Sequence, residues 1–305
     1  ANTGEVAALV WLANARRLPI VPVSGNTNLV KGTVAEGALM LSLDRMSAIR
    51  EIRADARVAV VEAGVILATL HAAAAEHDLI FPLSFGARGS AMVGGVLSTN
   101  AGASNVLRYG NTRDLCLGLE VVTPTGEVMN LMSALHKNNS GYDLRHLMIG
   151  AEGTLGIITA AVLKLFPRPR AYATAMVAVP TVGAALRLLH RLQDETGGAV
   201  EAFEYIPRSF LTVLLQRFPQ MRPPFEKSYD VNVLVELGGR APRDVMPDAS
   251  GTVPISAHLE AVLAGFYEEG LILDAVVAQS EAQRAEIWAR REASAQILRV
   301  RKPVV

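Results

Sequence analysis

The sequence contains one cysteine, few aromatic residues and no surplus of charge of either sign. Cys116 has no second cysteine to pair with, which excludes an internal disulfide framework and a cysteine-based metal cluster. Lysine and arginine together number 29, as do aspartate and glutamate, so no net field attracts nucleic acid or an anionic membrane. No apolar run approaches the ~20 residues that span a bilayer. We therefore expect a globular protein of a reducing compartment that binds no nucleic acid.

Histidine pairs with the spacing of a metal site are also missing. The six histidines include no pair three or four residues apart, the spacing that places two imidazoles on one face of a helix. The sequence therefore predicts no metal site in this chain.

Apolar residues are abundant: they make up half of the 305, enough for a large core and two domains. The texture of the sequence changes after Arg170. Before it, strand-like runs are separated by loops rich in glycine; after it, strand-like and helix-like runs alternate. We expect a first domain over residues 1–170 and a second over 171–305, in which one antiparallel sheet is covered by helices.

Three loops of small residues occur in the first domain, at residues 24–28, 84–104 and 150–156. The second holds so much glycine, serine and alanine that we expect no packed element there. A diphosphate requires several convergent backbone N–H donors with no Cβ in the way, and such loops supply them. A single loop of this kind is explained equally well by a tight turn, but three in one domain favour an anion site.

Two common phosphate motifs do not fit the sequence. A P-loop has Gly-Lys-Ser/Thr, whereas here the order is Lys31-Gly32-Thr33. A Rossmann fingerprint requires G-x-G-x-x-G between a strand and a helix, and the glycines from Gly86 to Gly95 have a different spacing. A nicotinamide dinucleotide on a Rossmann fold is therefore disfavoured.

Four stretches resemble successive blocks of the FAD-linked D-2-hydroxyacid dehydrogenases, a group that includes glycolate oxidase FAD subunits, D-lactate dehydrogenases and D-2-hydroxyglutarate dehydrogenases. They read PVSGNTNLVKG, FPLSFGARGSAMVGGVLSTNAGASNVLRYGNTRDLCLGLEVVTPTGEV, KNNSGYDLRHLMIGAEGTLGIITAAVLKLFPRPR and EIWARREA. The resemblance implies an α+β protein. Its first domain would be a two-lobed FAD-binding domain of the PCMH, or vanillyl-alcohol-oxidase, type. Its second would be a substrate, or cap, domain of the FAD-linked oxidase C-terminal type.

The resemblance also implies which residues hold FAD, bound without a covalent link. The first pyrophosphate loop matches Ser24, Gly25, Asn26, Thr27 and Asn28, and the second matches Pro82, Gly89, Ser90, Gly94 and Gly95. The segment beside the flavin matches Thr99, Asn100, Ala101 and Gly102, and the block for the adenosine and ribityl portions matches Glu152, Gly153, Gly156 and Ile158.

Two positions depart from the family, which commonly has glycine where Ser24 and Asn28 stand. Asparagine adopts the left-handed region more readily than other non-glycine residues, so we expect Asn28 to keep the bend. Ser24 is compatible with FAD if its φ is negative.

Substrate binding at the flavin requires an anchor for the carboxylate of the acid. In the family an arginine of the W-x-x-R-E segment has this role, and Arg291 matches it. Helical spacing places Trp288, Arg291, Ala295 and Leu298 on one face, so Arg291 is expected to point inward. A solvated arginine is the open alternative. Ala295 stands where the family has a threonine, which leaves that substrate contact open.

The metal ligands and catalytic histidine of the family come from a later "HGDGN"-like motif and a Glu-His pair. The sequence ends at RKPVV, upstream of both. We therefore expect the C-terminal part of the second domain to be missing, and a divalent metal such as zinc only in a longer protein.

The resemblance implies oxidation of a D-2-hydroxy acid of the glycolate, D-lactate or D-2-hydroxyglutarate type to the 2-oxo acid. Hydride would pass to flavin N5, and electrons would leave to a separate acceptor, left open between a quinone, an electron-transfer flavoprotein and a cytochrome. The alternative is a non-catalytic FAD-binding subunit or fragment that needs a partner or its missing C-terminus. A homodimer and companion subunits are both compatible with the sequence. We expect a cytoplasmic location, with peripheral attachment to a membrane as an alternative.

Overall fold

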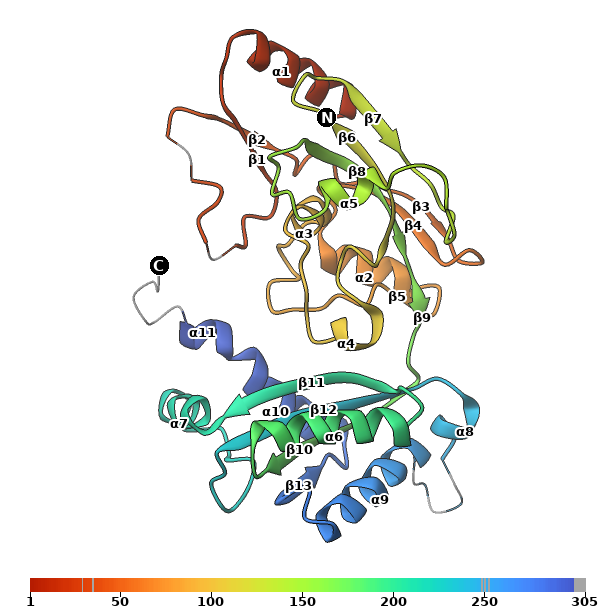
Figure 1. Ribbon diagram of the computed structural model, residues 1–305, viewed down its shortest axis with the longest axis vertical. Coiled ribbons are helices and arrows are strands. Elements are labelled where there is room, and N and C mark those ends of the chain that lie inside the picture. Colours follow the sequence, from red (N-terminus) through yellow and green to blue (C-terminus); the bar gives the residue numbers. More distant parts are fainter. Residues whose placement is uncertain (29, 35, 248, 250, 252, 299–305) are drawn as a thin grey trace. The chain divides into compact units, whose positions relative to one another are not determined.

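The computed structural model describes residues 1–28, 30–34, 36–247, 249, 251 and 253–298, and these form two compact units (Figure 1). Unit 1 comprises Ala1–Ala103 and Tyr109–Arg168. Unit 2 comprises Ser104–Arg108 and the chain from Pro169 onward. A short segment from the first half of the sequence therefore belongs to the second unit.

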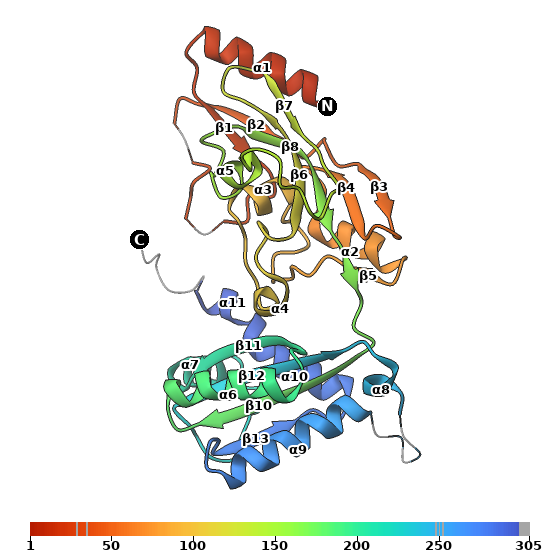
Figure 2. The ribbon, with the colours of Figure 1, turned by 45° about the vertical axis from the view of Figure 1, so that its right-hand side comes forward.

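The main sheet of unit 1 has five strands in the order β3-β4-β8-β6-β7, and every neighbouring pair is antiparallel (Figure 2). The central strand β8 is buried along almost its whole length, which explains its nearly continuous apolar sequence. The strands are β3 (Ile49–Arg53), β4 (Val58–Glu62), β6 (Cys116–Val122), β7 (Val128–Leu131) and β8 (Ile157–Lys164).

Two smaller sheets and several helices lie in the described part of residues 1–168, and one of these helices, in the Ser104–Arg108 segment, belongs mostly to unit 2. The parallel pair is β1 (Ile20–Val23) with β2 (Leu39–Ser42), and the antiparallel pair is β5 (Leu79–Ile80) with β9 (Phe166–Pro167). The helices are α1 (Thr3–Ala15), α2 (Leu67–Ala75), α3 (Val93–Ser98), α4 (Val106–Tyr109) and α5 (Leu144–Met148).

Helix α3 corrects one expectation from the sequence. It lies inside the loop of small residues at 84–104, where no packed element was expected, and Val93, Val96 and Leu97 are buried in the core of unit 1. Its glycines are the reason: a Cβ on Gly94 would come within 2.8 Å of the Ala63 Cβ. Glycine here permits close packing of the helix on the sheet rather than a loop.

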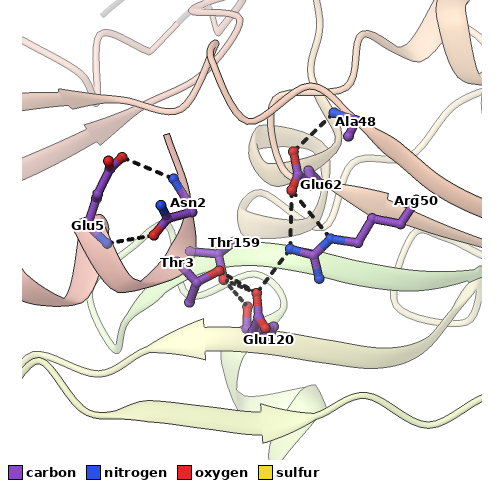
Figure 3. A network of polar contacts seen from close by, with 8 residues as sticks. All are labelled: Asn2, Thr3, Glu5, Ala48, Arg50, Glu62, Glu120 and Thr159. Atoms are coloured by element: carbon purple, nitrogen blue, oxygen red, sulfur yellow. Dashed lines mark hydrogen bonds and ion pairs between the residues drawn. The ribbon is translucent and has the colours of Figure 1, made fainter.

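A network of polar contacts in unit 1 centres on Glu120 of β6 (Figure 3). Its Oε1 accepts hydrogen bonds from Thr3 Oγ1 at 2.5 Å and Thr159 Oγ1 at 2.9 Å. Arg50 Nη2 lies 3.4 Å from the same oxygen and 3.3 Å from Glu62 Oε1. Burial raises the pKa of Glu120, but these hydrogen bonds outweigh it, so the net pKa is lowered and the carboxylate stays ionised. The network thus fixes the first turn of α1 on the sheet.

Unit 2 is built on one antiparallel sheet in the order β11-β12-β10-β13. The strands are β10 (Ala171–Val179), β11 (Val200–Pro207), β12 (Val231–Gly239) and β13 (Asp274–Val277). The helices are α6 (Val182–Glu195), α7 (Arg208–Arg217), α8 (Pro242–Val245), α9 (Pro254–Glu268), α10 (Glu281–Glu292) and α11 (Ser294–Leu298).

Helices cover both faces of this sheet (Figure 1). Alternate residues of a strand face opposite sides. Ala175 and Val177 of β10 pack in the cluster that contains α6 and α9, whereas Met176 and Ala178 pack in the cluster that contains α7 and α10. The α+β fold class expected from the sequence, with an antiparallel sheet covered by helices, is confirmed. Among the described residues no helix combines the length and apolarity needed to cross a membrane.

Candidate cofactor site

Unit 1 contains a cavity of about 570 Å³. This volume lies in the range typical of small-molecule sites. All of the cofactor residues expected from the sequence line it except Pro82, Gly89 and Ser90. They come from the loop after β1, from α3 and the turn that follows it, and from the loop before β8. The structure therefore gathers three separate stretches of small residues around one space.

The first loop presents unused backbone donors. Strand β1 ends at Val23, and Gly25, Asn26, Thr27 and Asn28 follow without regular structure. Within the described chain, none of the N–H groups of these four residues donates to an acceptor of another described residue. Backbone N–H groups that line a cavity without a partner are the donors an anionic group such as a diphosphate requires.

The bend in this loop lies at a different residue from the one expected. Asn26, not Asn28, has a positive φ, at 47°. The Asn26 Oδ1 also accepts a hydrogen bond from Thr33 Oγ1 at 2.7 Å, which fixes the left-handed turn. The expectation that Asn28 keeps the bend was wrong, because the identity of a residue does not reveal at which of two asparagines the chain turns. Ser24 is not among the positive-φ residues, as FAD compatibility required.

Glycines allow the three stretches to touch one another. A Cβ on Gly25 would overlap the backbone oxygen of Ser90, one on Gly95 would come within 2.5 Å of Ser24 Oγ, and one on Gly153 within 2.6 Å of Pro22 Cγ. The first two contacts join the first loop to the 84–104 stretch, and the third joins the turn before β8 to strand β1. A side chain at any of these positions would force the stretches apart.

The turn after α3 has fewer free donors than the first loop. The N–H groups of Thr99, Asn100 and Ala101 bond to carbonyl oxygens of α3, at Gly95, Leu97 and Val96 respectively. Thr99 Oγ1 also donates to the Gly95 oxygen, at 2.9 Å. This segment therefore ends helix α3. Its residues line the cavity, but the N–H groups of Thr99, Asn100 and Ala101 are not free to bind a ligand there.

The third stretch is fixed to the same helix end. Gly150 N donates to Leu97 O at 3.0 Å, and Glu152 N donates to Ser98 O at 2.9 Å. Glu152 has a φ of 52°, a left-handed conformation that these bonds maintain in a non-glycine residue. The turn before β8 is thus held against α3, and the cavity wall is continuous there.

Arg113 supports this wall, although the sequence gave no reason to select it. Its backbone N–H donates to Asn100 Oδ1 at 2.9 Å, and its guanidinium donates to the carbonyl oxygens of His146 and Ile149. Arg113 does not line the cavity. In the sequence, Arg113 is distinguished only by its place in the NTRD segment of the block that resembles the family, and that resemblance implies no role for it.

The cavity has almost no charge. Among its described lining residues Glu152 alone is ionisable, and none is a lysine, arginine, histidine or cysteine. Apolar side chains line part of it, from Leu43, Phe85, Met92, Ile157 and Ile158. Free backbone donors for a diphosphate and an apolar wall for a ring system together fit a flavin dinucleotide.

The three expected residues outside the cavity have other places in the fold. The Ser90 carbonyl oxygen lies against Gly25, at a distance that is possible only because Gly25 has no Cβ. Pro82 is buried between Phe81 and Leu83. A Cβ on Gly89 would meet nothing within 4 Å. Ser90 therefore supports the first loop rather than facing the cavity.

Arg291 lies in the last turn of α10 in unit 2. Its Nε donates to Glu204 Oε2 at 2.6 Å and its Nη1 to Ser294 Oγ at 3.2 Å, and 37% of its side chain is exposed. Trp288 Nε1, one turn earlier, donates to Glu236 Oε2 at 2.7 Å. The side chains of Ala295 and Leu298, the other two residues of the expected face, lie outside what the structure describes.

The KNNSGYDL block leads into α5, where Asp143 and Arg145 form an ion pair. The Arg145 guanidinium lowers the pKa of Asp143 to about 2. Arg145 also donates to the carbonyl oxygens of Cys116 and Leu117.

Burial raises the pKa of the Cys116 thiol to about 12, so this cysteine is an unreactive core residue. Within the described chain no cluster of histidine, cysteine, aspartate and glutamate could hold a metal.

Solved structures share the fold of this chain. Alkyldihydroxyacetonephosphate synthase matches with a TM-score of 0.69 and 20% identity, over 98% of this chain and 54% of that one. p-Cresol methylhydroxylase with bound substrate matches with a TM-score of 0.70 and 17% identity, over 94% of this chain and 59% of that one. The fold is therefore the one expected from the sequence, the PCMH-type flavin fold.

Sequence comparison supplies the family. The family model described as "FAD binding domain" matches residues 1–132, and the one described as "FAD linked oxidases, C-terminal domain" matches residues 168–305. The chain belongs to the FAD-linked oxidase family, as the resemblance predicted, and FAD is its cofactor.

Curated relatives match along nearly the whole chain. D-2-hydroxyglutarate dehydrogenase of Xanthomonas citri pv. viticola is 39% identical over 289 residues, which cover 94% of this chain and 58% of the relative. The mitochondrial D-2-hydroxyglutarate dehydrogenase of Arabidopsis thaliana is 34% identical, over 95% of this chain and 50% of the relative. A D-2-hydroxyglutarate–pyruvate transhydrogenase of Saccharomyces cerevisiae is 32% identical, over 95% and 57%. The chain thus spans about half the length of these relatives.

Proposed function

We propose that the protein containing this chain oxidises a D-2-hydroxy acid to the 2-oxo acid with FAD, and that D-2-hydroxyglutarate is the substrate. The observation that carries the proposal is the cavity of unit 1, formed by the three stretches that resemble the family and lined mainly by uncharged residues. Several relatives are named for D-2-hydroxyglutarate, which supports the choice of acid.

The residues of the chain would bind and orient the reactants. The backbone N–H groups of Gly25 to Asn28 would hold the diphosphate of FAD, and the apolar wall with Phe85 and Met92 would exclude water from the cofactor. Bound FAD supplies an acceptor for the hydride from the α-carbon of the acid. Arg291 would pair with a substrate carboxylate through its guanidinium fork. We also retain Pro82, Gly89 and Ser90 as supports of the cofactor loops.

The electron acceptor is a separate question. A relative named as a transhydrogenase with pyruvate suggests a second 2-oxo acid as one acceptor, beside a quinone, an electron-transfer flavoprotein or a cytochrome. Steady-state assays with each acceptor in turn would rank them.

Anaerobic mixing of the FAD-loaded protein with D-2-hydroxyglutarate tests the proposal. We expect the flavin absorbance band to bleach with D-2-hydroxyglutarate, more slowly with D-lactate and glycolate, and not with L-2-hydroxyglutarate. If FAD binds but no D-2-hydroxy acid bleaches it, even in a protein of the relatives' length, the non-catalytic FAD-binding subunit becomes the correct interpretation.

A further inference from the structure

Glu204 of β11 lies between two residues that are far apart in the sequence. Its Oε2 accepts the hydrogen bond from Arg291 Nε at 2.6 Å, and its Oε1 accepts one from Ser104 Oγ at 2.5 Å. Only 19% of the Glu204 side chain is exposed. All three residues belong to unit 2. One carboxylate therefore uses both of its oxygens to connect Arg291 with the short segment Ser104–Arg108.

The contact leaves most of the Arg291 fork available. Glu204 bonds to Nε, and Ser294 Oγ accepts from Nη1 at 3.2 Å; Nη2 has no partner among the described residues. A guanidinium held at Nε can still donate two parallel N–H bonds from its Nη groups to a carboxylate. Because the Nε contact fixes the plane of the guanidinium, less side-chain entropy is lost when an anion binds.

The Ser104–Arg108 segment is itself firmly attached to β11. Asn105 Nδ2 donates to Glu201 Oε2 at 3.2 Å, and Arg108 Nη1 donates to Glu201 Oε1 at 2.6 Å and to Gly238 O at 2.9 Å. Glu201 is almost fully buried, with 1% of its side chain exposed. Ser104 follows the cavity-lining Gly102 by only two residues. The segment whose Ser104 bonds to Glu204 is therefore itself held on the sheet by the side chains of Asn105 and Arg108.

We propose that Glu204 is a positioning residue that orients Arg291 for the carboxylate of the acid. The inference rests on the proposed function, in which Arg291 pairs with that carboxylate. The competing interpretation is that Glu204 neutralises Arg291 and occupies the place of the anion. The geometry favours positioning, because Glu204 takes the single Nε–H and not the Nη fork.

Binding of 2-oxoglutarate, the product expected from D-2-hydroxyglutarate, tests the proposal without turnover. The dissociation constant is measured by isothermal titration calorimetry and by perturbation of the flavin absorbance in the FAD-loaded protein. For Glu204→Ala we expect binding to weaken about 10-fold, since the fork is no longer oriented. For Glu204→Gln we expect a loss of about 3-fold, because the amide oxygen still accepts one hydrogen bond. The matched control is Glu269→Ala, which removes the carboxylate paired with Arg191 at 2.9 Å and should leave binding unchanged.

A double-mutant cycle separates positioning from a general structural effect. Arg291→Ala should weaken binding about 100-fold, and adding Glu204→Ala to it should change affinity by less than about 2-fold. Unchanged or tighter binding by Glu204→Ala, or a full 10-fold loss that persists without Arg291, overturns the positioning role. If the wild-type protein binds FAD but neither 2-oxo nor 2-hydroxy acids, the proposed function itself fails, and this inference fails with it. Thermal unfolding of each variant shows whether it folds; if Glu204→Ala does not, Glu204→Gln carries the same test.

Discussion

The cavity of unit 1 and the sheet of unit 2 differ in the polar groups that they present. In unit 1 the cavity is lined by glycine-rich backbone, and Glu152 is the single ionisable residue among its described lining. In unit 2 three carboxylates on the adjacent strands β11 and β12, those of Glu201, Glu204 and Glu236, are each paired with an arginine. A neutral backbone cradle suits a cofactor that stays bound, whereas paired charges in a sheet can orient a cation toward a small anionic substrate.

Glu236 shows how far this pairing extends. Its Oε2 accepts from Thr174 Oγ1 at 2.6 Å, Trp288 Nε1 at 2.7 Å and Arg284 Nε at 2.8 Å, while Arg284 Nη2 donates to Oε1 at 2.9 Å. The Arg284 guanidinium lies 4.2 Å from the centre of the Tyr172 ring. Trp288 and Arg284 belong to α10, the helix that carries Arg291. The tryptophan of the W-x-x-R segment therefore fixes this helix on the sheet through a buried carboxylate.

The largest effect is expected from closing the neutral cradle. In Gly25→Val the new side chain would overlap the Ser90 carbonyl oxygen and displace the first loop. We expect FAD affinity to fall about 1000-fold, which corresponds to about 4 kcal/mol. Fluorescence titration of the apoprotein with FAD measures the change.

Another glycine provides the control for this substitution. Gly86→Val should keep the wild-type affinity, because a Cβ at Gly86 meets nothing within 4 Å. Equal losses in both variants would mean that the glycines act through folding of the loop and not through the contact with Ser90.

Removing the central carboxylate of unit 2 comes next. Glu236→Ala leaves Arg284 and Trp288 without their acceptor in a site where the carboxylate is only 5% exposed. Breaking a buried ion pair costs about 3–5 kcal/mol, and the 27% exposure of Arg284 places the expected loss of unfolding free energy near the lower end. Urea denaturation followed by circular dichroism measures it.

The same arginine offers a matched surface control. Glu281 also pairs with Arg284, at 3.4 Å, but 81% of its side chain is exposed. Glu281→Ala should therefore change the unfolding free energy by less than about 0.5 kcal/mol. A loss as large as that of Glu236→Ala would contradict the distinction between buried and exposed pairs.

The Glu120 network predicts a smaller loss in unit 1. Thr3→Val removes one hydrogen bond to the partly buried Glu120 carboxylate. Thr159 and Arg50 still donate to that carboxylate in the variant. We expect a loss of about 1 kcal/mol in unfolding free energy. Hydrogen exchange should show faster opening of α1, with β8 unaffected.

The smallest expected effect is a pH dependence at Asp143. Its pKa is lowered to about 2 by Arg145, below the ordinary value near 4. The unfolded carboxyl binds its proton first, so the stabilisation is present above about pH 4 and is lost as the pH falls toward 2. Because 40% of the side chain is exposed, we expect less than about 0.5 kcal/mol. Thermal unfolding of wild type and Asp143→Asn should converge at pH 2; a difference that grows on acidification would contradict this assignment.

Much of unit 1 is predictable because its signal is local. Runs of glycine, serine and asparagine after apolar strands indicated three loops, and the structure gathers them around one cavity. The burial of α3 and the bend at Asn26 were not predictable. Helix α3 depends on the close approach of Gly94 to Ala63, and the bend depends on a contact with Thr33.

Unit 2 is predictable only in its outline. The alternation of strand-like and helix-like runs predicted an antiparallel sheet covered by helices, which the structure contains. The pairs Glu204–Arg291 and Glu201–Arg108 join residues 87 and 93 positions apart, and no local pattern in a single sequence indicates such partners. Ser104–Arg108 was assigned with the first domain because its sequence continues the glycine-rich block, whereas its side chains bond to β11.

Titration of the apoprotein with FAD and, in parallel, with riboflavin tests the central claim, that neutral backbone donors of unit 1 hold the diphosphate. Riboflavin has the same ring system but lacks the diphosphate and adenosine. The account predicts that FAD binds at least about 100-fold more tightly than riboflavin and that this preference collapses in Gly25→Val. Equal affinity for the two ligands, or a preference that Gly25→Val leaves intact, would contradict it.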